Sequence, residues 1–131
     1  MSTHPHFNDK GALVWYTDFK TALQEARKQN KKLFIDSGRR ACGNCRVLIE
    51  TIIPKEEIKS LLNEHFIAYA DDCDEMAPEV QELGVEHMRH ASTLPFMMFT
   101  DAEGEWIAGA SGATNPTQFL ALVKQACRLT Q

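Results

Sequence analysis

The tetrad Cys42-Gly43-Asn44-Cys45 restricts the fold of this chain more than any other feature, because it stands where an apolar run gives way to a helical pattern. The apolar residues at 33–37 predict a short buried strand, and the spacing of apolar residues over 47–53 predicts a helix that begins at the tetrad. The first backbone N–H groups of a helix lack intrahelical partners and carry partial positive charge, so they favour a thiolate at Cys42. Cys45 lies one helical turn further on, which brings its sulfur back to that of Cys42. The pattern therefore predicts a redox dithiol at a strand-to-helix turn.

Two other interpretations of the tetrad depend on the remaining cysteines and histidines. A structural zinc site takes four ligands and needs a second pair at comparable spacing, whereas Cys73 and Cys127 stand apart from each other. The nearest histidine pair, His87 and His90, has no cysteine beside it. A zinc site and a pair of inert cysteines remain alternatives, and a C-x-x-C near a βαβ pattern favours the dithiol. The dithiol requires no metal and no organic cofactor, and we expect none.

The composition is that of an ordinary globular domain, with 44% hydrophobic and 24% charged residues. A net charge of −4 gives no electrostatic basis for binding nucleic acid or an anionic membrane. No apolar stretch is long enough to insert across a bilayer, and the N-terminal residues have neither the basic region nor the apolar core of a signal peptide. We therefore expect a cytoplasmic protein, or a periplasmic one if an export signal has been removed.

Strand and helix patterns alternate along most of the chain. Residues 1–11 are polar, with a proline and two histidines, so we expect a flexible N-terminal arm ahead of one domain over residues 12–131. Short apolar runs predict strands at residues 12–16, 33–37, 66–70, 96–100 and 106–110. Helical spacing, capping residues and a break at Pro54 predict helices at residues 18–30, 42–53, 55–64 and 76–83, and a last helix that begins at Asn115-Pro116.

The two cysteines outside the tetrad are expected to be unreactive for different reasons. Cys127 falls on the apolar stripe of the last helix, which predicts a small buried core residue. Cys73 stands among four acidic residues, whose negative charge opposes formation of a thiolate. Its expected exposure leaves glutathionylation or crosslinking open.

The order of strands and helices, with a C-x-x-C at the end of the second strand, resembles the thioredoxin fold over residues 14–129. Asp36 stands in the place of the buried thioredoxin aspartate, and Cys42 and Cys45 stand in those of the attacking and resolving cysteines. Leu94-Pro95 precedes an apolar strand as the cis-proline loop does, and Gly112 matches the glycine that lets the last strand bend. The resemblance implies an α/β thioredoxin fold, a central mixed β-sheet with helices on both faces.

Longer stretches point to branches of this family. Residues 19–26 and 30–36 are similar to the C-terminal domain of the electron carrier DsbD and to small bacterial thioredoxin-related proteins. Residues 61–66 are similar to the N-terminal thioredoxin-like domain of spermatogenesis-associated proteins. Together these motifs are more specific than the C-x-x-C alone.

The surroundings of the tetrad depart from the thioredoxin pattern. Ala41 replaces the usual tryptophan before the attacking cysteine, and Asn44 replaces the proline between the cysteines. Three arginines flank the tetrad instead: Arg39, Arg40 and Arg46. We expect Arg40 and Arg46 to favour the thiolate at Cys42 and to make the couple more oxidising. The alternative is a solvated basic loop, because salt screens exposed charges over about 8–10 Å.

The predicted strand at residues 66–70 carries no lysine where thioredoxin has one, so Asp36 is expected to lack a charged partner. Burial of an unpaired carboxylate favours its protonated form, which suits a group that takes the proton of Cys45 as this thiol attacks a mixed disulfide. The alternative is that Asp36 faces a water channel or caps the loop.

These features predict a thiol–disulfide oxidoreductase. Cys42 is expected to be the nucleophile, Cys45 the resolving thiol and Asp36 the proton acceptor. The resemblance implies that Leu94, Pro95, Gly43 and Asn44 bind the substrate. We expect a monomer that exchanges disulfides with protein or small thiol substrates and with a reducing or oxidising protein partner. The alternative is a non-catalytic thioredoxin-like binding module whose cysteines are regulatory or vestigial, since a fold does not fix a function.

Overall fold

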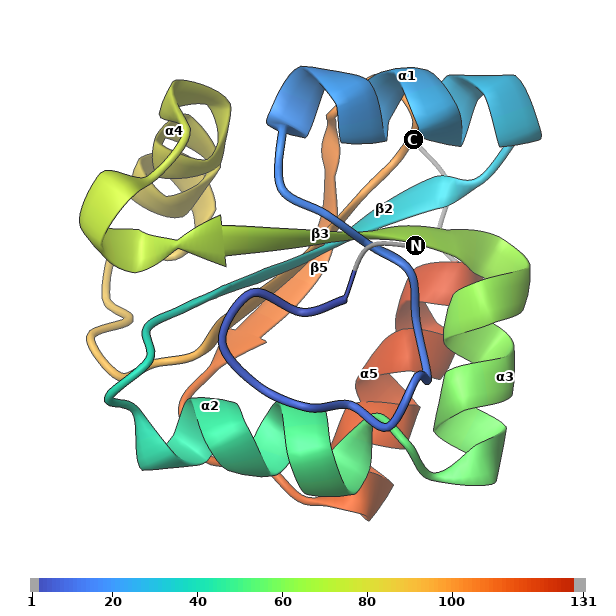
Figure 1. Cartoon of the computed structure of the whole chain (residues 1–131). Coiled ribbons are helices and arrows are strands. Elements are labelled where there is room, and N and C mark those ends of the chain that lie inside the picture. The colour runs from blue at the N-terminus through green and yellow to red at the C-terminus, as the bar shows by residue number, and fades with distance from the viewer. Residues whose placement is uncertain (1–2, 129–131) are drawn as a thin grey trace.

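The computed structural model describes residues 3–128, which form a five-stranded sheet between two layers of helices (Figure 1). The elements follow in the order β1 Trp15–Tyr16, α1 Phe19–Gln29, β2 Lys32–Gly38, α2 Gly43–Val47, the π-helical segment η1 Leu48–Ile52, α3 Glu56–His65, β3 Phe66–Asp72, the 3₁₀ turn η2 Cys73–Glu75, α4 Pro78–His87, β4 Phe96–Thr100, β5 Trp106–Ser111 and α5 Pro116–Arg128. The predicted sequence of strands and helices is confirmed. Residues 1–2 and 129–131 of the predicted arm and domain lie outside the described residues.

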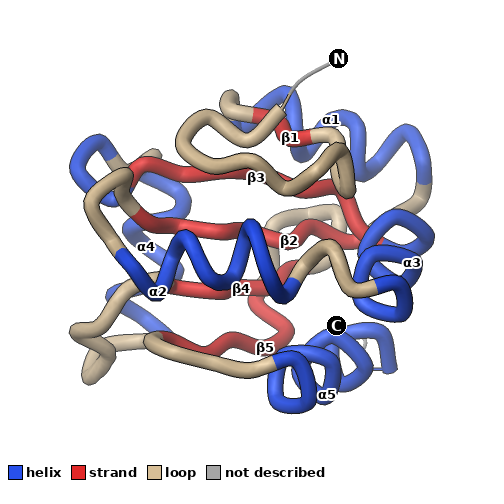
Figure 2. Tube along the Cα trace, turned by 60° about the horizontal axis from the view of Figure 1, so that its bottom comes forward, coloured by secondary structure: helices blue, strands red, loops and turns tan. Residues whose placement is uncertain are grey.

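The strand order in the sheet is β1-β3-β2-β4-β5. Strands β1, β3 and β2 run parallel, and β4 and β5 are antiparallel to their neighbours, so the sheet is mixed as expected. Helices α1 and α4 cover one face, and α2, α3 and α5 cover the other (Figure 2). Strand β2 lies in the middle of the sheet with helices on both sides, which is why its sequence is a nearly continuous apolar run.

The side chains of β2 alternate between the two cores. Leu33 and Ile35 pack in the core beneath α1 and α4, whereas Phe34 packs in the core beneath α2, α3 and α5. Successive residues of a strand point to opposite faces, so Asp36 lies on the same face as Phe34 and is directed toward the α2 side. A carboxylate thus stands in an otherwise apolar layer.

Local signals explain where the flanking helices begin and end. The Asp18 side chain accepts a hydrogen bond from the Thr21 backbone N–H and caps α1, and Asn30 ends this helix in the left-handed region at φ 56°. Asn115 caps α5 by accepting from the Gln118 backbone N–H at 2.8 Å, with Pro116 in the first turn. Among the helices of residues 3–128, none combines the length and apolar character needed to cross a membrane.

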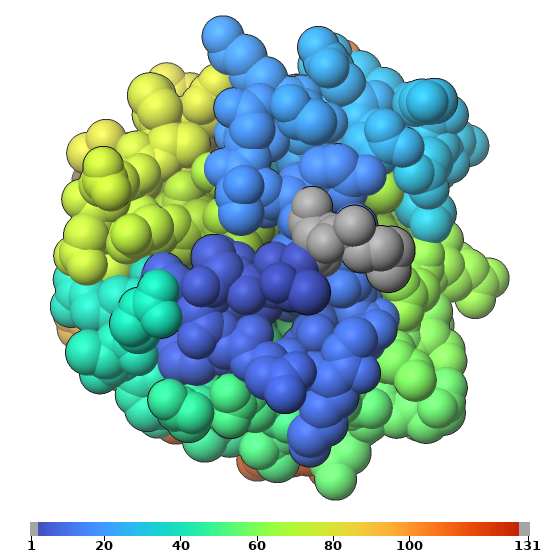
Figure 3. Space-filling model, viewed as in Figure 1, coloured from blue at the N-terminus to red at the C-terminus, as the bar shows by residue number. Residues whose placement is uncertain are grey.

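The N-terminal segment does not form the loose arm that its polar composition predicts. The side chains of His4, Phe7 and Asp9 are buried, and Asp9 accepts from the Trp15 indole N–H at 2.8 Å. Figure 3 shows this segment in dark blue on the surface between α1 and α2. Phe7 of this segment belongs to the same core cluster as Trp15 of β1, so the segment closes the core over Trp15. The folded unit therefore begins well before residue 12.

Candidate active site

The tetrad lies where β2 leads into α2, as predicted. Cys42 is the N-cap of α2, and its Sγ accepts a hydrogen bond from the Cys45 backbone N–H at 3.1 Å. Cys42 is partly exposed, Cys45 is 1% exposed, and both are free thiols. Partial exposure and a helix N–H directed at the sulfur give Cys42 the setting of an attacking nucleophile.

The Cys45 thiol is in a different environment. Burial is the main cause that raises its pKa to about 12; the hydrogen bond with Cys42 and the negative charges of Cys42 and Asp36 contribute to this rise, and a hydrogen bond with the Arg39 backbone opposes it. The sulfur lies against the end of β2, because a Cβ added to Gly38 would stand 2.7 Å from Cys45 Sγ. Gly38 thus makes room for the second sulfur, a role that the sequence analysis missed.

The Leu94-Pro95 loop is adjacent to the tetrad, and its peptide bond is cis as the resemblance implied. The Asn44 side-chain amide donates to the Leu94 carbonyl at 3.3 Å, and Pro95 is buried near Gly38. The structure therefore brings three of the predicted substrate-binding residues together beside the dithiol, and Gly43 is exposed at the start of α2. That these four residues bind a substrate remains a prediction.

Asp36 is 2% exposed and has a partner that the sequence analysis did not foresee. His4 Nε2 lies 2.9 Å from Asp36 Oδ2, and both side chains are buried. The sequence analysis expected no charged partner for Asp36, and the structure gives it a hydrogen-bonded histidine, which comes from the N-terminal segment and not from β3. One signal was available: a buried carboxylate needs a donor, and the absence of a lysine on β3 means that another part of the chain has to supply it.

Two of the three arginines near the tetrad are engaged with carboxylates. Arg39 Nη2 lies 2.7 Å from Asp74 Oδ1, and Arg46 Nη1 lies 3.4 Å from Glu50 Oε1. Both side chains are about half exposed or more, so the solvent screens their charges further. Arg40 is exposed in the loop before α2. The tuning of Cys42 by Arg40 and Arg46 therefore remains a prediction, and the ion pairs favour the alternative of a solvated basic loop.

A family model described as the thioredoxin-like domain matches residues 19–127. The chain belongs to the thioredoxin-like family. Spermatogenesis-associated protein 20 of Mus musculus is 32% identical to this thioredoxin-like chain over 92 residues, which are 70% of the chain and 10% of that protein. The chain thus spans about a tenth of the length of the curated relatives it matches.

Solved structures share the fold at lower sequence identity. A thioredoxin from Thermus thermophilus has a TM-score of 0.70 and 20% identity, with 89% of this chain and 88% of that chain covered. The oxidised C-terminal domain of DsbD from Neisseria meningitidis has a TM-score of 0.62 and 18% identity, with 86% of this chain and 99% of that chain covered. The predicted thioredoxin fold is confirmed.

The other two cysteines of this thioredoxin-like domain differ from the tetrad. Burial chiefly raises the pKa of Cys73, with Asp74 and Asp72 adding to the shift and Arg39 opposing it. Burial also raises the pKa of Cys127. Cys127 packs against the edge of the core and stays partly exposed, so it lies on the apolar stripe as predicted but is only partly buried.

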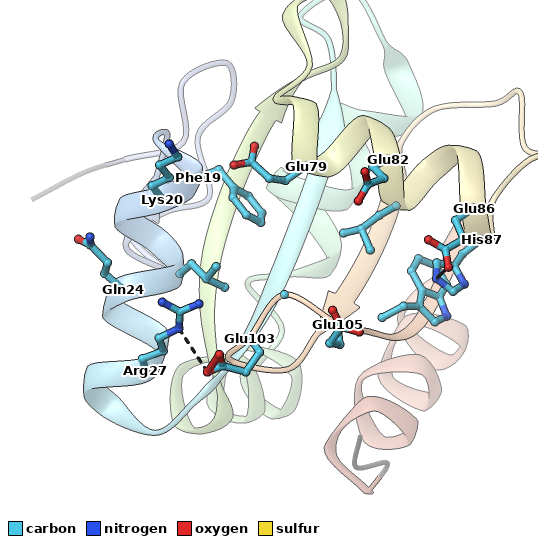
Figure 4. A pocket seen from close by; sticks show the side chains of 14 residues that line it. Phe19, Lys20, Gln24, Arg27, Glu79, Glu82, Glu86, His87, Glu103 and Glu105 are labelled. Atoms are coloured by element: carbon cyan, nitrogen blue, oxygen red, sulfur yellow. Dashed lines mark ion pairs between the residues drawn. The ribbon is translucent and has the colours of Figure 1, made fainter.

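A groove with a volume of about 470 Å³ lies on the opposite face of the sheet, between α1, α4 and the β4–β5 turn (Figure 4). Its rim is acidic, with five glutamates: Glu79, Glu82, Glu86, Glu103 and Glu105. Lys20 and Arg27 extend from α1, and Arg27 pairs with Glu103 at 3.4 Å. Neither cysteine of the tetrad lines this groove, so the groove and the dithiol are separate features.

Proposed function

We propose that this thioredoxin-like domain is a thiol–disulfide oxidoreductase that uses Cys42 and Cys45. The observation that carries the proposal is the contrast between the two thiols. Cys42 is accessible and its sulfur accepts the Cys45 backbone N–H, whereas Cys45 is buried with its thiol held protonated. An accessible thiolate can attack a partner, and a shielded thiol one turn away can resolve the product within the same chain.

The reaction proceeds in two exchanges. Cys42 Sγ forms a bond with one sulfur of the substrate disulfide, and the other substrate sulfur leaves with the electron pair. Cys45 Sγ then bonds to Cys42 Sγ, and the first substrate sulfur leaves as a thiolate, so the substrate is reduced and the dithiol is oxidised to a disulfide. A second protein reduces this disulfide, or the cycle runs in reverse with an oxidising partner.

The second exchange needs a base. A thiol with a pKa near 12 is ionised in roughly one molecule in 10⁵ at pH 7. Asp36 is buried on the same face of β2 as Gly38, two residues away along the strand, and the Cys45 sulfur lies against Gly38. We assign to Asp36 the removal of the Cys45 proton.

The substrate is proposed to lie along the Leu94-Pro95 loop. The Asn44 side-chain amide donates to the Leu94 carbonyl, and Gly43, which follows Cys42 in the chain, is exposed. Such groups suit an extended segment of a disulfide-bearing protein, which pairs through its backbone. We propose that the domain acts as a monomer on such substrates.

Trapping of mixed disulfides tests the proposal. Cys45→Ser should accumulate mixed disulfides with protein substrates because the resolving thiol is missing, whereas Cys42→Ser should accumulate few or none. Cys73→Ser is the matched control and should trap no more than the unchanged protein. Equal trapping by Cys45→Ser and Cys42→Ser would contradict a single attacking thiol. Insulin reduction with dithiothreitol is the second measurement, and absence of turnover there together with absence of trapping would favour the non-catalytic binding module.

A further inference from the structure

The pair formed by His4 and Asp36 joins the N-terminal segment to the strand beneath the dithiol. Their side chains are each 3% exposed, and His4 Nε2 lies 2.9 Å from Asp36 Oδ2. The His4 ring packs edge-on against Trp15 at 4.7 Å between ring centroids and stacks on Phe7 at 5.7 Å. Aromatic neighbours on these sides and two hydrogen-bonded nitrogens fix the orientation of the imidazole.

The hydrogen bonds of the His4 ring define its tautomer. Nδ1 accepts from the backbone N–H groups of His6 and Phe7, at 3.1 and 3.2 Å. A nitrogen that accepts these bonds carries no proton, so the ring proton of the neutral imidazole is on Nε2. His4 therefore donates its Nε2–H to Asp36 Oδ2. Asp36 Oδ2 is the acceptor of this bond.

The two oxygens of Asp36 are in different settings. Oδ2 accepts from His4, whereas Oδ1 is buried and has no hydrogen-bond partner among residues 3–128. Buried carboxylate oxygens are normally satisfied, so an open one next to a reactive group marks an acceptor that is in reserve. Asp36 lies on the same face of β2 as Gly38, against which the Cys45 sulfur rests, and its charge acts on the Cys45 thiol.

We infer that His4 is a positioning residue of the redox site, which holds the Asp36 carboxyl group oriented so that Oδ1 takes the proton of Cys45. The inference rests on the proposed function and adds the N-terminal segment to its machinery. As Cys45 Sγ bonds to Cys42 Sγ, the Cys45 proton moves to Asp36 Oδ1, and the bond from Cys42 to the substrate sulfur breaks with its electron pair on that sulfur. Asp36 later returns the proton to the departing thiolate or to water, and His4 keeps its own proton throughout.

Other titratable groups around the pair do not provide the same donor. The His6 ring lies 5.9 Å from the His4 ring, and Asp9 accepts from Trp15. Arg46 stands over the Phe7 ring and pairs with Glu50. The strands beside Asp36 present Ala70 and Met97, which do not titrate, and α2 presents the two cysteines. His4 is therefore the donor that the described residues direct at Asp36.

The rate of the resolving step as a function of pH tests this inference. Reduced protein is mixed with glutathione disulfide, quenched with acid at intervals, and assayed by mass spectrometry for conversion of the Cys42–glutathione mixed disulfide to the internal disulfide. His4→Leu removes the donor, so the buried Asp36 carboxylate loses the hydrogen bond that orients it and becomes a poorer acceptor for the Cys45 proton. We expect resolution at pH 6–7 to slow by about 10- to 100-fold, with the rate recovering as pH rises, since a hydrogen bond to a charged group is worth about one to two factors of ten.

Two matched variants separate the donor from the ring. His4→Gln retains an N–H that can reach Asp36. Its resolving step should therefore proceed at a rate within about threefold of that of the unchanged protein, a much smaller loss than in His4→Leu. His6→Gln keeps the backbone N–H that donates to His4 Nδ1, so it should leave the rate of the resolving step and its pH profile unchanged. If His4→Leu keeps the normal rate and profile, or loses the same factor at every pH, His4 is only a structural residue and the inference is wrong.

Measurements on the unchanged protein keep the test decisive if His4→Leu does not fold. Nitrogen-15 NMR of the histidines should show His4 with its proton on Nε2, and this signal should shift between the dithiol and disulfide forms. A proton on Nδ1, or a signal insensitive to the redox state, would overturn the inference. If the unchanged protein forms the mixed disulfide but never the internal disulfide, then the proposed function itself fails, and this inference fails with it.

Discussion

Replacing Asp9 with alanine removes the acceptor on which the N-terminal segment closes. Asp9 is 2% exposed, and its Oδ2 accepts from the Leu13 backbone N–H at 3.0 Å and from the Trp15 indole N–H at 2.8 Å. Leu13 and Trp15 are buried, so both donors would lose their partner in a place with little access to water. The third donor, the Gly11 backbone N–H at 3.1 Å from Oδ1, belongs to an exposed residue and can bind water instead.

The expected loss follows from these two buried donors. Each buried donor left without an acceptor costs about 1–3 kcal/mol, so Asp9→Ala should lower the free energy of unfolding by about 2–6 kcal/mol. Asp9→Asn keeps one carbonyl oxygen, which can accept from both Leu13 and Trp15, and it should lose only about 1–2 kcal/mol because a neutral acceptor replaces a charged one. Asn8→Ala is the control at an exposed neighbour and should change stability by no more than about 0.5 kcal/mol.

Urea unfolding, followed by tryptophan fluorescence and circular dichroism, measures these differences. The urea midpoint should be lowest for Asp9→Ala, higher for Asp9→Asn and highest for Asn8→Ala. The free energy of unfolding should fall with urea concentration at the same slope in all of them. If Asp9→Ala stays within about 0.5 kcal/mol of the unchanged protein, the N-terminal segment does not pack on Trp15, and the argument that it closes the core is wrong.

Three further predictions follow from the thiols and the sheet. Iodoacetamide should label Cys42 of the reduced protein before Cys45, Cys73 or Cys127, because Cys42 is partly exposed with a helix N–H at its sulfur and the pKa of each of the other three thiols is raised; peptide mapping that finds Cys73 labelled first would contradict this assignment. The raised pKa of Cys45 stabilises the reduced fold fully below pH 9.0, the ordinary value for the thiol, and this contribution is lost as pH rises toward about 12. The difference in unfolding free energy between the unchanged protein and Cys45→Ser should therefore fall by up to about 1.4 kcal/mol per pH unit above pH 9, and a constant difference up to pH 11 would refute the assignment. Gly109→Ala would place a Cβ 2.9 Å from the Met97 carbonyl oxygen and in contact with the Trp106 ring, so we expect a loss of about 1–3 kcal/mol in urea unfolding. The control is Gly84→Ala in α4, where a Cβ meets nothing within 4 Å and should stabilise the helix by about 0.5–1 kcal/mol; equal effects of the two substitutions would contradict the packing argument.

Local physics made much of the fold predictable. The cap at Asp18 and the left-handed Asn30 mark the ends of α1 in sequence as they do in the structure. The apolar run in β2 reflects its burial on both faces, and the tetrad reflects the helix start that follows. These signals lie within a few residues of the structure they specify, so the sequence carries them without knowledge of the fold.

For other features, the neighbouring residues in the sequence do not indicate how long a helix is or with which residue a side chain pairs. Helix α4 extends to His87, four residues beyond the predicted end. Val80 and Leu83 of this helix pack in the core, and the helix continues for one more turn past Leu83. Arg39 pairs with Asp74 across 35 positions of the sequence, so one of the three arginines that flank the tetrad is part of a surface ion pair. Periodicity and composition contain no information about such pairs.

The sequence by itself determined the family, the order of strands and helices, and the placement of Cys42 and Cys45 at a helix start. Only the tertiary structure decided that His4 faces Asp36 across 32 positions of the sequence. The reason is that a polar segment without periodicity packs where the rest of the fold leaves room for it, and the sequence does not show where that is. Here that place lies over Trp15 and beside Asp36, where an aromatic side chain and a buried carboxylate offer a histidine both packing and an acceptor.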